Sequence, residues 1–223
     1  APTVSSVSVP SAGSYNAGDT LSFTVNTSEA VTVVTTGGTP QIALTIGSTT
    51  RQASYVSGST STALVFSYTV QSGDTDADGI AVGTLSANGG TLKDSAGNDL
   101  TLTLNSVGNT ASVLVDTTAP TISSVSLSAD NSSLTVTFSE SVYSTNGGSG
   151  DLAAADFALS ISGGTATVTS TPSSITKTSQ SVWVLGVSLS GTPDGNETLS
   201  VVPASTTSIY DVAGNAASTT QSN

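Results

Sequence analysis

Acidic residues occupy every second position in one short stretch of the chain, Asp74-Thr75-Asp76-Ala77-Asp78-Gly79. Carboxylates on a tight loop can surround one hard cation, and the glycine permits the sharp bend that such a loop needs. The stretch is not a complete EF-hand loop, because Leu85 stands at the twelfth position, where a bidentate glutamate is required. We therefore predict a calcium site that recruits further ligands from elsewhere. The alternative is a solvated acidic turn.

Two other acidic motifs each occur twice. Glu29 lies in S-E-A-V and Glu140 in S-E-S-V, while Asp94 begins D-S-A-G-N and Asp211 begins D-V-A-G-N. Carboxylates that recur in pairs favour a repeated ion site. A D-x-A-G-N segment can also be a plain turn, in which Asp and Asn cap the local backbone and glycine adopts a positive φ.

The amino-acid composition argues against several classes of function. Fifteen acids face three bases among 223 residues, a net charge of −12, so the chain lacks the Lys/Arg clusters that nucleic acid and anionic lipid require. Cysteine and histidine are absent, which removes disulfides, thiolate and imidazole metal sites, and the usual nucleophile–base pairs. Carboxylate pairs could hydrolyse glycosides, but these acids lie in turns. We expect a protein that binds cations and is not an enzyme.

Alternation of apolar and polar residues predicts strands along the whole chain. Leu21, Phe23 and Val25 alternate with polar residues, and turn clusters separate this run from the next. Short strands at this spacing are typical of a β-sandwich. In the first half we expect strands at 4–9, 20–26, 41–46, 51–56, 63–70, 80–85 and 100–115, the last one broken near residue 108. In the second half we expect strands at 122–127, 133–138, 157–161, 165–169, 181–189 and 198–202, an edge strand near 217, and one helical turn at 151–156.

The chain restarts near its midpoint. Ala119-Pro120-Thr121-Ile122-Ser123-Ser124-Val125-Ser126 nearly repeats Ala1-Pro2-Thr3-Val4-Ser5-Ser6-Val7-Ser8, which indicates a tandem array. We predict two Ig-like Greek-key β-sandwich domains end to end, 1–116 and 117–223.

The Ig-like topology groups the acids by the end of the sandwich to which their loops belong. We expect Glu140, Asp211 and the backbone of Asn215 at the top of the second domain, and Asp19 with Asp74–Asp78 at the bottom of the first domain beside Asp116. These two groups are expected to face each other across the seam. Glu29 and Asp94 would form the same half-site for a preceding domain.

Three motifs in order carry a family resemblance: the D-T-T-A-P-T linker, F-S-E-x-V after the second strand, and D-x-A-G-N before the last strand. Together they resemble the immunoglobulin-like extender repeats of large bacterial adhesins, RTX-type biofilm and ice-binding proteins among them. The resemblance implies a calcium-stiffened stalk that projects a ligand-binding tip from the surface of a Gram-negative bacterium. The second domain departs from it, because it has no D-x-D-x-D-G segment.

We thus expect a monomeric, extracellular structural module whose partners are neighbouring Ig-like repeats of the same chain. The alternative is a module of the same adhesin that binds a glycan or peptide through calcium. No signal peptide or membrane-spanning run is visible, and we expect the chain to be a section of a longer protein. The only tryptophan, Trp183, shares its parity with Leu185 and Val187, which predicts a core position rather than a sugar platform.

Overall fold

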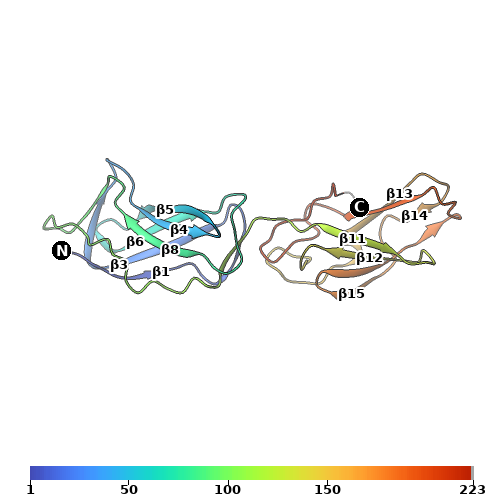
Figure 1. Ribbon diagram of the computed structural model, residues 1–223, viewed down its shortest axis with the longest axis horizontal. Coiled ribbons are helices and arrows are strands. Elements are labelled where there is room, and N and C mark those ends of the chain that lie inside the picture. Colours follow the sequence, from blue (N-terminus) through green and yellow to red (C-terminus); the bar gives the residue numbers. More distant parts are fainter. Residues whose placement is uncertain (222–223) are drawn as a thin grey trace. The chain divides into compact units, whose positions relative to one another are not determined.

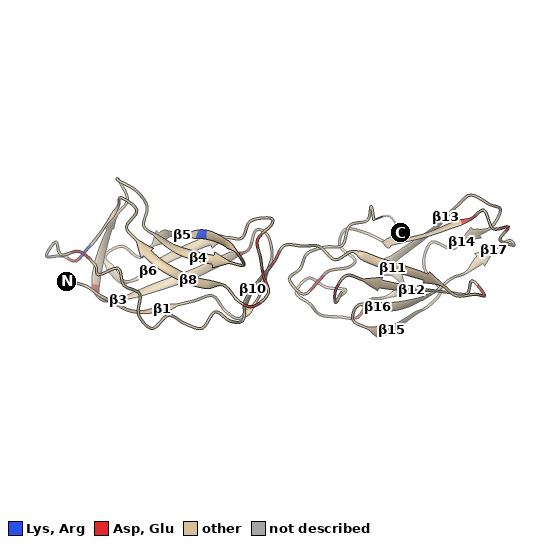
Figure 2. Cartoon of the chain, viewed as in Figure 1, with Lys and Arg blue, Asp and Glu red and all other residues tan. Residues whose placement is uncertain are grey.

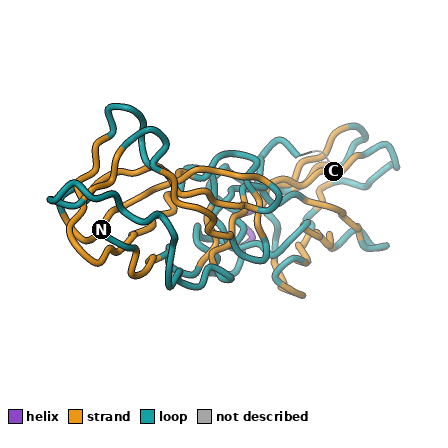
Figure 3. Tube along the Cα trace, turned by 60° about the vertical axis from the view of Figure 1, so that its left-hand side comes forward, coloured by secondary structure: helices purple, strands orange, loops and turns teal. Residues whose placement is uncertain are grey.

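The computed structural model describes residues 1–221 and shows an all-β protein (Figure 3). Its only helical element in this range is the 3₁₀ turn η1, Ala154–Asp156. The chain divides into two compact units, Ala1–Thr117 and Thr118–Asn223. This boundary lies one residue beyond the one predicted from the sequence. No helix in the described range is long and apolar enough to cross a membrane.

The first unit contains one large sheet and one small sheet (Figure 1). The large sheet has the order β1-β3-β6-β5-β4-β8, with β9 also paired to β3, and the small sheet has the order β2-β10-β7. The large sheet consists of β1 (Val4–Ser8), β3 (Thr20–Val34), β4 (Gln41–Ile46), β5 (Thr49–Ser57), β6 (Ser61–Thr69), β8 (Ala81–Ser86) and β9 (Thr91–Lys93). The small sheet consists of β2 (Gly13–Tyr15), β7 (Thr75–Asp76) and β10 (Val113–Asp116).

Alternation decides which face of the large sheet forms the core. Leu21, Phe23 and Val25 of β3 are fully buried, while the residues between them face outward or are half-buried. Phe23 lies opposite Phe66 of β6 in the register, and both rings are inaccessible to solvent. Burial of aromatic and branched side chains in such pairs is a main source of sheet stability.

Only the strand predicted at 41–46 has the same bounds in the structure; the strands predicted at 4–9, 51–56, 63–70 and 80–85 differ by one or two residues at an end, and two others differ by more. The strand predicted to end at residue 26 continues to Val34, past a register shift between Asn26 and Val31, and its last part pairs with β9. The strand predicted at 100–115 is wrong over most of its length. Only Val113–Asp116 is a strand, because the chain before it is irregular and Ser106 has a φ of 45°.

The second unit contains a four-stranded sheet, β11-β12-β16-β15, and two pairs, β13-β18 and β14-β17. The predicted bounds of β11 and β12 are confirmed to the residue. The sheet consists of β11 (Ile122–Leu127), β12 (Ser133–Phe138), β15 (Ile175–Ser179) and β16 (Val182–Gly186). The pairs consist of β13 (Phe157–Ser162), β18 (Thr198–Pro203), β14 (Thr167–Val168) and β17 (Leu189–Ser190).

Three predictions for the second unit need correction. The strand predicted at 181–189 is divided into β16 and β17. The pattern of polar residues concealed β15, whose residues are mostly exposed. The edge strand predicted near 217 is absent from the described range, where Ala216 forms a single bridge to Tyr210.

Trp183 lies in the core of the second unit, as predicted. Its side chain is almost inaccessible to solvent, and the indole Nε1–H donates a hydrogen bond to the Gln180 carbonyl at 3.2 Å. A buried indole usually has such a partner.

Candidate metal centre

The acidic residues of both units lie mainly in loops and at strand ends (Figure 2). One group of three carboxylates stands out among the described residues: Asp116, Glu140 and Asp211 can each offer an oxygen, and these oxygens lie within 4.8 Å of one another. Asp211 is fully buried, and the other two are partly buried. Such proximity costs electrostatic energy unless a cation or a proton is shared.

Sheet pairing positions Asp116. It is the last residue of β10, where it pairs with Thr75 of β7. The next residue, Thr117, accepts a hydrogen bond from the Gly73 N–H at 2.9 Å and donates one to the Asp74 carbonyl at 3.0 Å. The chain on both sides of the Asp116 carboxylate is therefore fixed to the acidic loop of the first unit. No motif around Thr117 predicted these two hydrogen bonds.

The D-x-A-G-N turn positions Asp211. One carboxylate oxygen accepts the Asn215 N–H at 2.8 Å, and the other accepts the Asn215 side-chain amide at 2.7 Å. The Asp211 N–H donates to the Asn215 carbonyl at 3.1 Å, and Gly214 has a φ of 94°. The turn thus holds a buried carboxylate in one orientation. Asp211 therefore shows both features considered from the sequence: its side chain caps the local turn, and it lies close to Glu140.

The first unit contains the same turn. Asp94 accepts the Asn98 N–H at 2.8 Å and the Asn98 side-chain amide at 2.7 Å. The side-chain bond from Asn98 is the main cause that lowers the pKa of Asp94 below its usual value. Glu29 lies at the same end, with its Oε1 3.9 Å from the Ala1 amino group. These two acids do not belong to a group of three within the described chain, so the predicted half-site remains a prediction.

The Asp74 side chain is buried in the first unit, where it joins a network of hydrogen bonds and an ion pair that the sequence did not reveal. Its side chain is inaccessible to solvent and lies 2.6 Å from the Arg51 guanidinium. Tyr68 Oη donates to it at 2.5 Å and the Gln71 N–H at 2.9 Å. Burial by itself would raise the pKa of Asp74, but the bonds from Tyr68, Gln71 and Arg51 outweigh burial and lower it. Arg51 is the only arginine in the chain, which could have drawn attention to it.

Asp76 is also buried, and backbone donors surround it. Gly47 N–H donates to its Oδ2 at 2.7 Å, while Gly79 N–H donates to its Oδ1 at 2.8 Å. Asp78 is exposed. In the described chain, the carboxylates of Asp74, Asp76 and Asp78 are not grouped closely enough for a three-carboxylate site. The network explains the two buried acids without an ion, and calcium binding by this loop stays a prediction.

Asp19 caps a turn. Its Oδ2 accepts the Asn16 N–H at 2.9 Å, and the side chain is exposed. Burial, with a smaller contribution from the Asp19 charge, raises the pKa of the nearby Tyr15. The structure does not place Asp19 in a group of three acids within the described range.

The donor set at Asp116, Glu140 and Asp211 fits a hard cation. All three residues supply carboxylate oxygens, which calcium prefers at about 2.3–2.6 Å. Two oxygens on opposite sides of one such ion are about 4.6–5.2 Å apart, so a separation of up to 4.8 Å allows all three to bind the same ion. Calcium takes six to eight oxygens, and water or carbonyl oxygens would supply the others.

Comparison with known protein families finds no family model that matches the chain, and comparison with curated proteins finds no significant match.

Proposed function

We propose that this chain is a non-catalytic, calcium-binding extender segment of a bacterial cell-surface adhesin, built from two Ig-like Greek-key sandwiches in series. The observation that carries the proposal is the group of carboxylates at Asp116, Glu140 and Asp211. Two of these acids belong to motifs that the sequence repeats, and the third ends the last strand of the first unit.

The acidic composition supports calcium as the ion. The chain has a net charge of −12 and no histidine or cysteine, so its metal ligands are oxygens, which favour hard cations over zinc or copper. Extracellular calcium modules have weak sites, with Kd values of about 10⁻⁴–10⁻³ M. An extracellular location is consistent with that range and with the resemblance to adhesin repeats.

The mechanism is a restriction of the linker. Pro120 limits Ala119 to extended conformations, but the short polar segment after Asp116 contains no bulky side chain. An ion bound by Asp116, Glu140 and Asp211 would neutralise their mutual repulsion and reduce the freedom of this segment. The carboxylates supply the charge, and the two D-x-A-G-N hydrogen bonds to Asp211 orient one of them before the ion arrives.

The structure also bears on the alternative, a calcium-dependent glycan or peptide site at the acidic loop of the first unit. That alternative needs exposed aromatic side chains beside Asp74–Asp78. Tyr68 contacts Asp74, but it is 9% exposed and its hydroxyl is bonded to the carboxylate. This arrangement favours the extender.

Small-angle scattering tests the extender function. In calcium, the distribution of maximum dimensions should be narrow, and in chelator it should broaden. Asp116→Asn should behave in calcium as the parent chain behaves in chelator, while Asp130→Asn, which removes the same charge elsewhere, should behave as the parent. A chain that is equally rigid in chelator would contradict the proposal.

A further inference from the structure

Four pairs of neighbouring residues in the chain can undergo a spontaneous cyclisation. They are Asn88-Gly89, Asn146-Gly147, Asp78-Gly79 and Asp194-Gly195. In such a pair the glycine nitrogen can attack the side-chain carbonyl carbon of the residue before it, because glycine has no Cβ to hinder the approach. Asparagine is the more reactive partner, since the aspartate carboxylate is ionised at neutral pH and is a poor electrophile. The way each pair is held decides whether it reacts in the folded protein.

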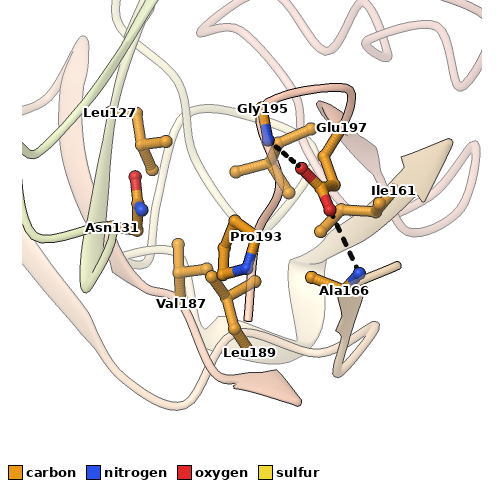
Figure 4. A pocket seen from close by; sticks show the side chains of 10 residues that line it. Leu127, Asn131, Ile161, Ala166, Val187, Leu189, Pro193, Gly195 and Glu197 are labelled. Carbon is orange, nitrogen blue, oxygen red and sulfur yellow. Dashed lines mark hydrogen bonds between the residues drawn. The ribbon is translucent and has the colours of Figure 1, made fainter. Parts of the chain in front are cut away.

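Both Asp-Gly pairs are restrained at the attacking nitrogen. The glycine N–H of Asp78-Gly79 donates to Asp76 Oδ1 at 2.8 Å. The glycine N–H of Asp194-Gly195 donates to Glu197 Oε2 at 3.0 Å (Figure 4). A nitrogen whose proton is held by a carboxylate must first lose that bond before it can attack, which leaves the two Asn-Gly pairs as the candidates.

The first Asn-Gly pair is held between two loops of the first unit, although both of its residues are exposed. Asn88 Nδ2 donates to the Thr39 carbonyl at 3.0 Å, and the Asn88 N–H donates to Ser86 Oγ at 3.1 Å. The glycine is packed closely as well, since a Cβ built on Gly89 would lie 2.5 Å from the Gly37 carbonyl oxygen. The Asn88 side chain can therefore turn toward the next amide only when the two loops separate.

The second Asn-Gly pair is also exposed, and it lies at the tip of a short hairpin in the second unit. Thr145 and Ser149 close this hairpin, and the Thr145 N–H donates to the Ser149 carbonyl at 3.2 Å. A Cβ built on Gly147 would have no atom within 4 Å. No hydrogen bond holds the Asn146 side chain within the part of the chain that the structure describes. Asn146 can therefore reach the Gly147 nitrogen without the loss of a side-chain hydrogen bond.

This hairpin packs on the D-x-A-G-N turn of the second unit. A Cβ built on Gly214 would lie 2.9 Å from Asn146 Cγ, and a Cβ built on Gly148 would lie 3.1 Å from Val212 Cα. In the first unit, the equivalent glycine is Gly97, and a Cβ built on it would have no atom within 4 Å. A change at Asn146 therefore acts directly beside the turn that orients a buried carboxylate.

We propose that Asn146 is a site of spontaneous deamidation in the folded protein, whereas Asn88 is protected. The Gly147 nitrogen loses its proton and attacks Asn146 Cγ, the bond from Cγ to the amide nitrogen breaks, and ammonia leaves with that proton. Water then opens the cyclic imide at either carbonyl carbon and leaves aspartate or isoaspartate at position 146. The net reaction consumes one water molecule and releases one ammonia molecule, so it needs no enzyme and no oxidant.

Either product adds a negative charge to a chain whose net charge is already −12. Isoaspartate also lengthens the main chain by one atom inside the closed hairpin, which should weaken the bridge between Thr145 and Ser149. The charge and the shape of this hairpin therefore change with the age of the protein, whether or not the chain binds an ion.

Incubation of the full chain in neutral buffer, followed over weeks by peptide mapping with mass spectrometry, tests the proposal. Conversion at Asn146 should be at least about tenfold faster than at Asn88, because the reactive conformation of Asn88 requires the loss of a hydrogen bond and the separation of packed loops. In a chain unfolded with guanidinium chloride, the two sites should react at similar rates. Gly147→Ala has room for its Cβ, and it should slow the reaction at Asn146 in the folded chain.

The outcomes separate protection from chemistry. Equal rates at Asn146 and Asn88 in the folded chain would overturn the proposal, because the surroundings would then give no protection to Asn88. A rate at Asn146 that is far lower in the folded chain than in the unfolded chain would also overturn it, because the hairpin would then prevent the attack. Conversion that gives no isoaspartate and is unchanged in Gly147→Ala would be direct hydrolysis of the amide and would overturn the cyclic route.

Discussion

The network around Asp74 makes the sharpest prediction about stability in the first unit. Tyr68→Phe removes the hydroxyl that donates to the buried carboxylate and keeps the ring that packs in the core. A hydrogen bond to a charged group contributes about 1.5–3 kcal/mol. We expect the unfolding free energy of the first unit at pH 7 to fall by about 2 kcal/mol, because Asp74 keeps its bonds to Gln71 and Arg51.

The same network predicts how stability changes in alkali. Burial, followed by the bond to Asp74, raises the pKa of Tyr68 from its usual value of 10.0 to about 12. A group with a raised folded pKa stabilises fully below its unfolded pKa, and this contribution is lost as pH rises through the folded value. Two pKa units correspond to at most about 2.7 kcal/mol, before screening by solvent is discounted. The loss should occur between pH 10 and 12.

Urea unfolding followed by circular dichroism at pH 7 and across this alkaline range measures both effects. Tyr55→Phe, at a residue whose ring also packs on Phe66, controls for the loss of a tyrosine hydroxyl. If Tyr68→Phe and Tyr55→Phe change stability equally at pH 7, and both retain the alkaline loss of the parent, the account of the Asp74 network is wrong.

Other predictions concern single sites. Gly79→Ala should destabilise the first unit by more than about 2 kcal/mol, because φ is +102° and a Cβ would lie 2.5 Å from Ala111 Cα. Gly73→Ala is the control, because its φ is +91° but no atom lies within 4 Å of the added Cβ, so this variant should lose only the cost of the φ strain. Equal melting temperatures for the two variants would refute the predicted clash at Gly79. Trp183→Ala should cost the second unit about 3–5 kcal/mol, measured by urea unfolding, and a loss below 1 kcal/mol would contradict its role in the core. Bonds from N–H groups, that of Ala166 first, lower the pKa of Glu197 to about 2, so its contribution is present above pH 4.5 and is lost as pH falls through about 2. Thermal melts from pH 2 to 7 should therefore show a smaller acid loss in Glu197→Gln, and an unchanged acid limb would refute this.

Local alternation was enough to predict most strands from the sequence. The residues of β3 and β12 alternate between buried and outward-facing positions, and their pattern in sequence is equally clear. Strand bounds differ from the predicted ones where tertiary pairing overrides the local pattern. The register shift after Asn26 extends β3 through polar residues, and the alternation at 100–104 predicts a strand that does not form.

The residues of the candidate site were likewise predictable from the sequence only in part. Repetition of S-E-x-V and D-x-A-G-N was sufficient to single out Glu140 and Asp211, and the seam singled out Asp116. The orientation of Asp74 could not be read from spacing, because it depends on Arg51 and Tyr68, which come from β5 and β6. An alternating acidic stretch looks the same in sequence whether its carboxylates face a cation or face internal donors.

Calorimetric titration with calcium tests the central claim most directly. The parent chain should bind calcium with measurable heat, and Asp116→Asn should lose a site or weaken it at least tenfold, because it removes one of three charged ligands from Asp116, Glu140 and Asp211. Asp130→Asn, which removes an acid outside that group, should titrate as the parent does. Absence of calcium binding by the parent, or identical affinity and stoichiometry in Asp116→Asn, would contradict the account.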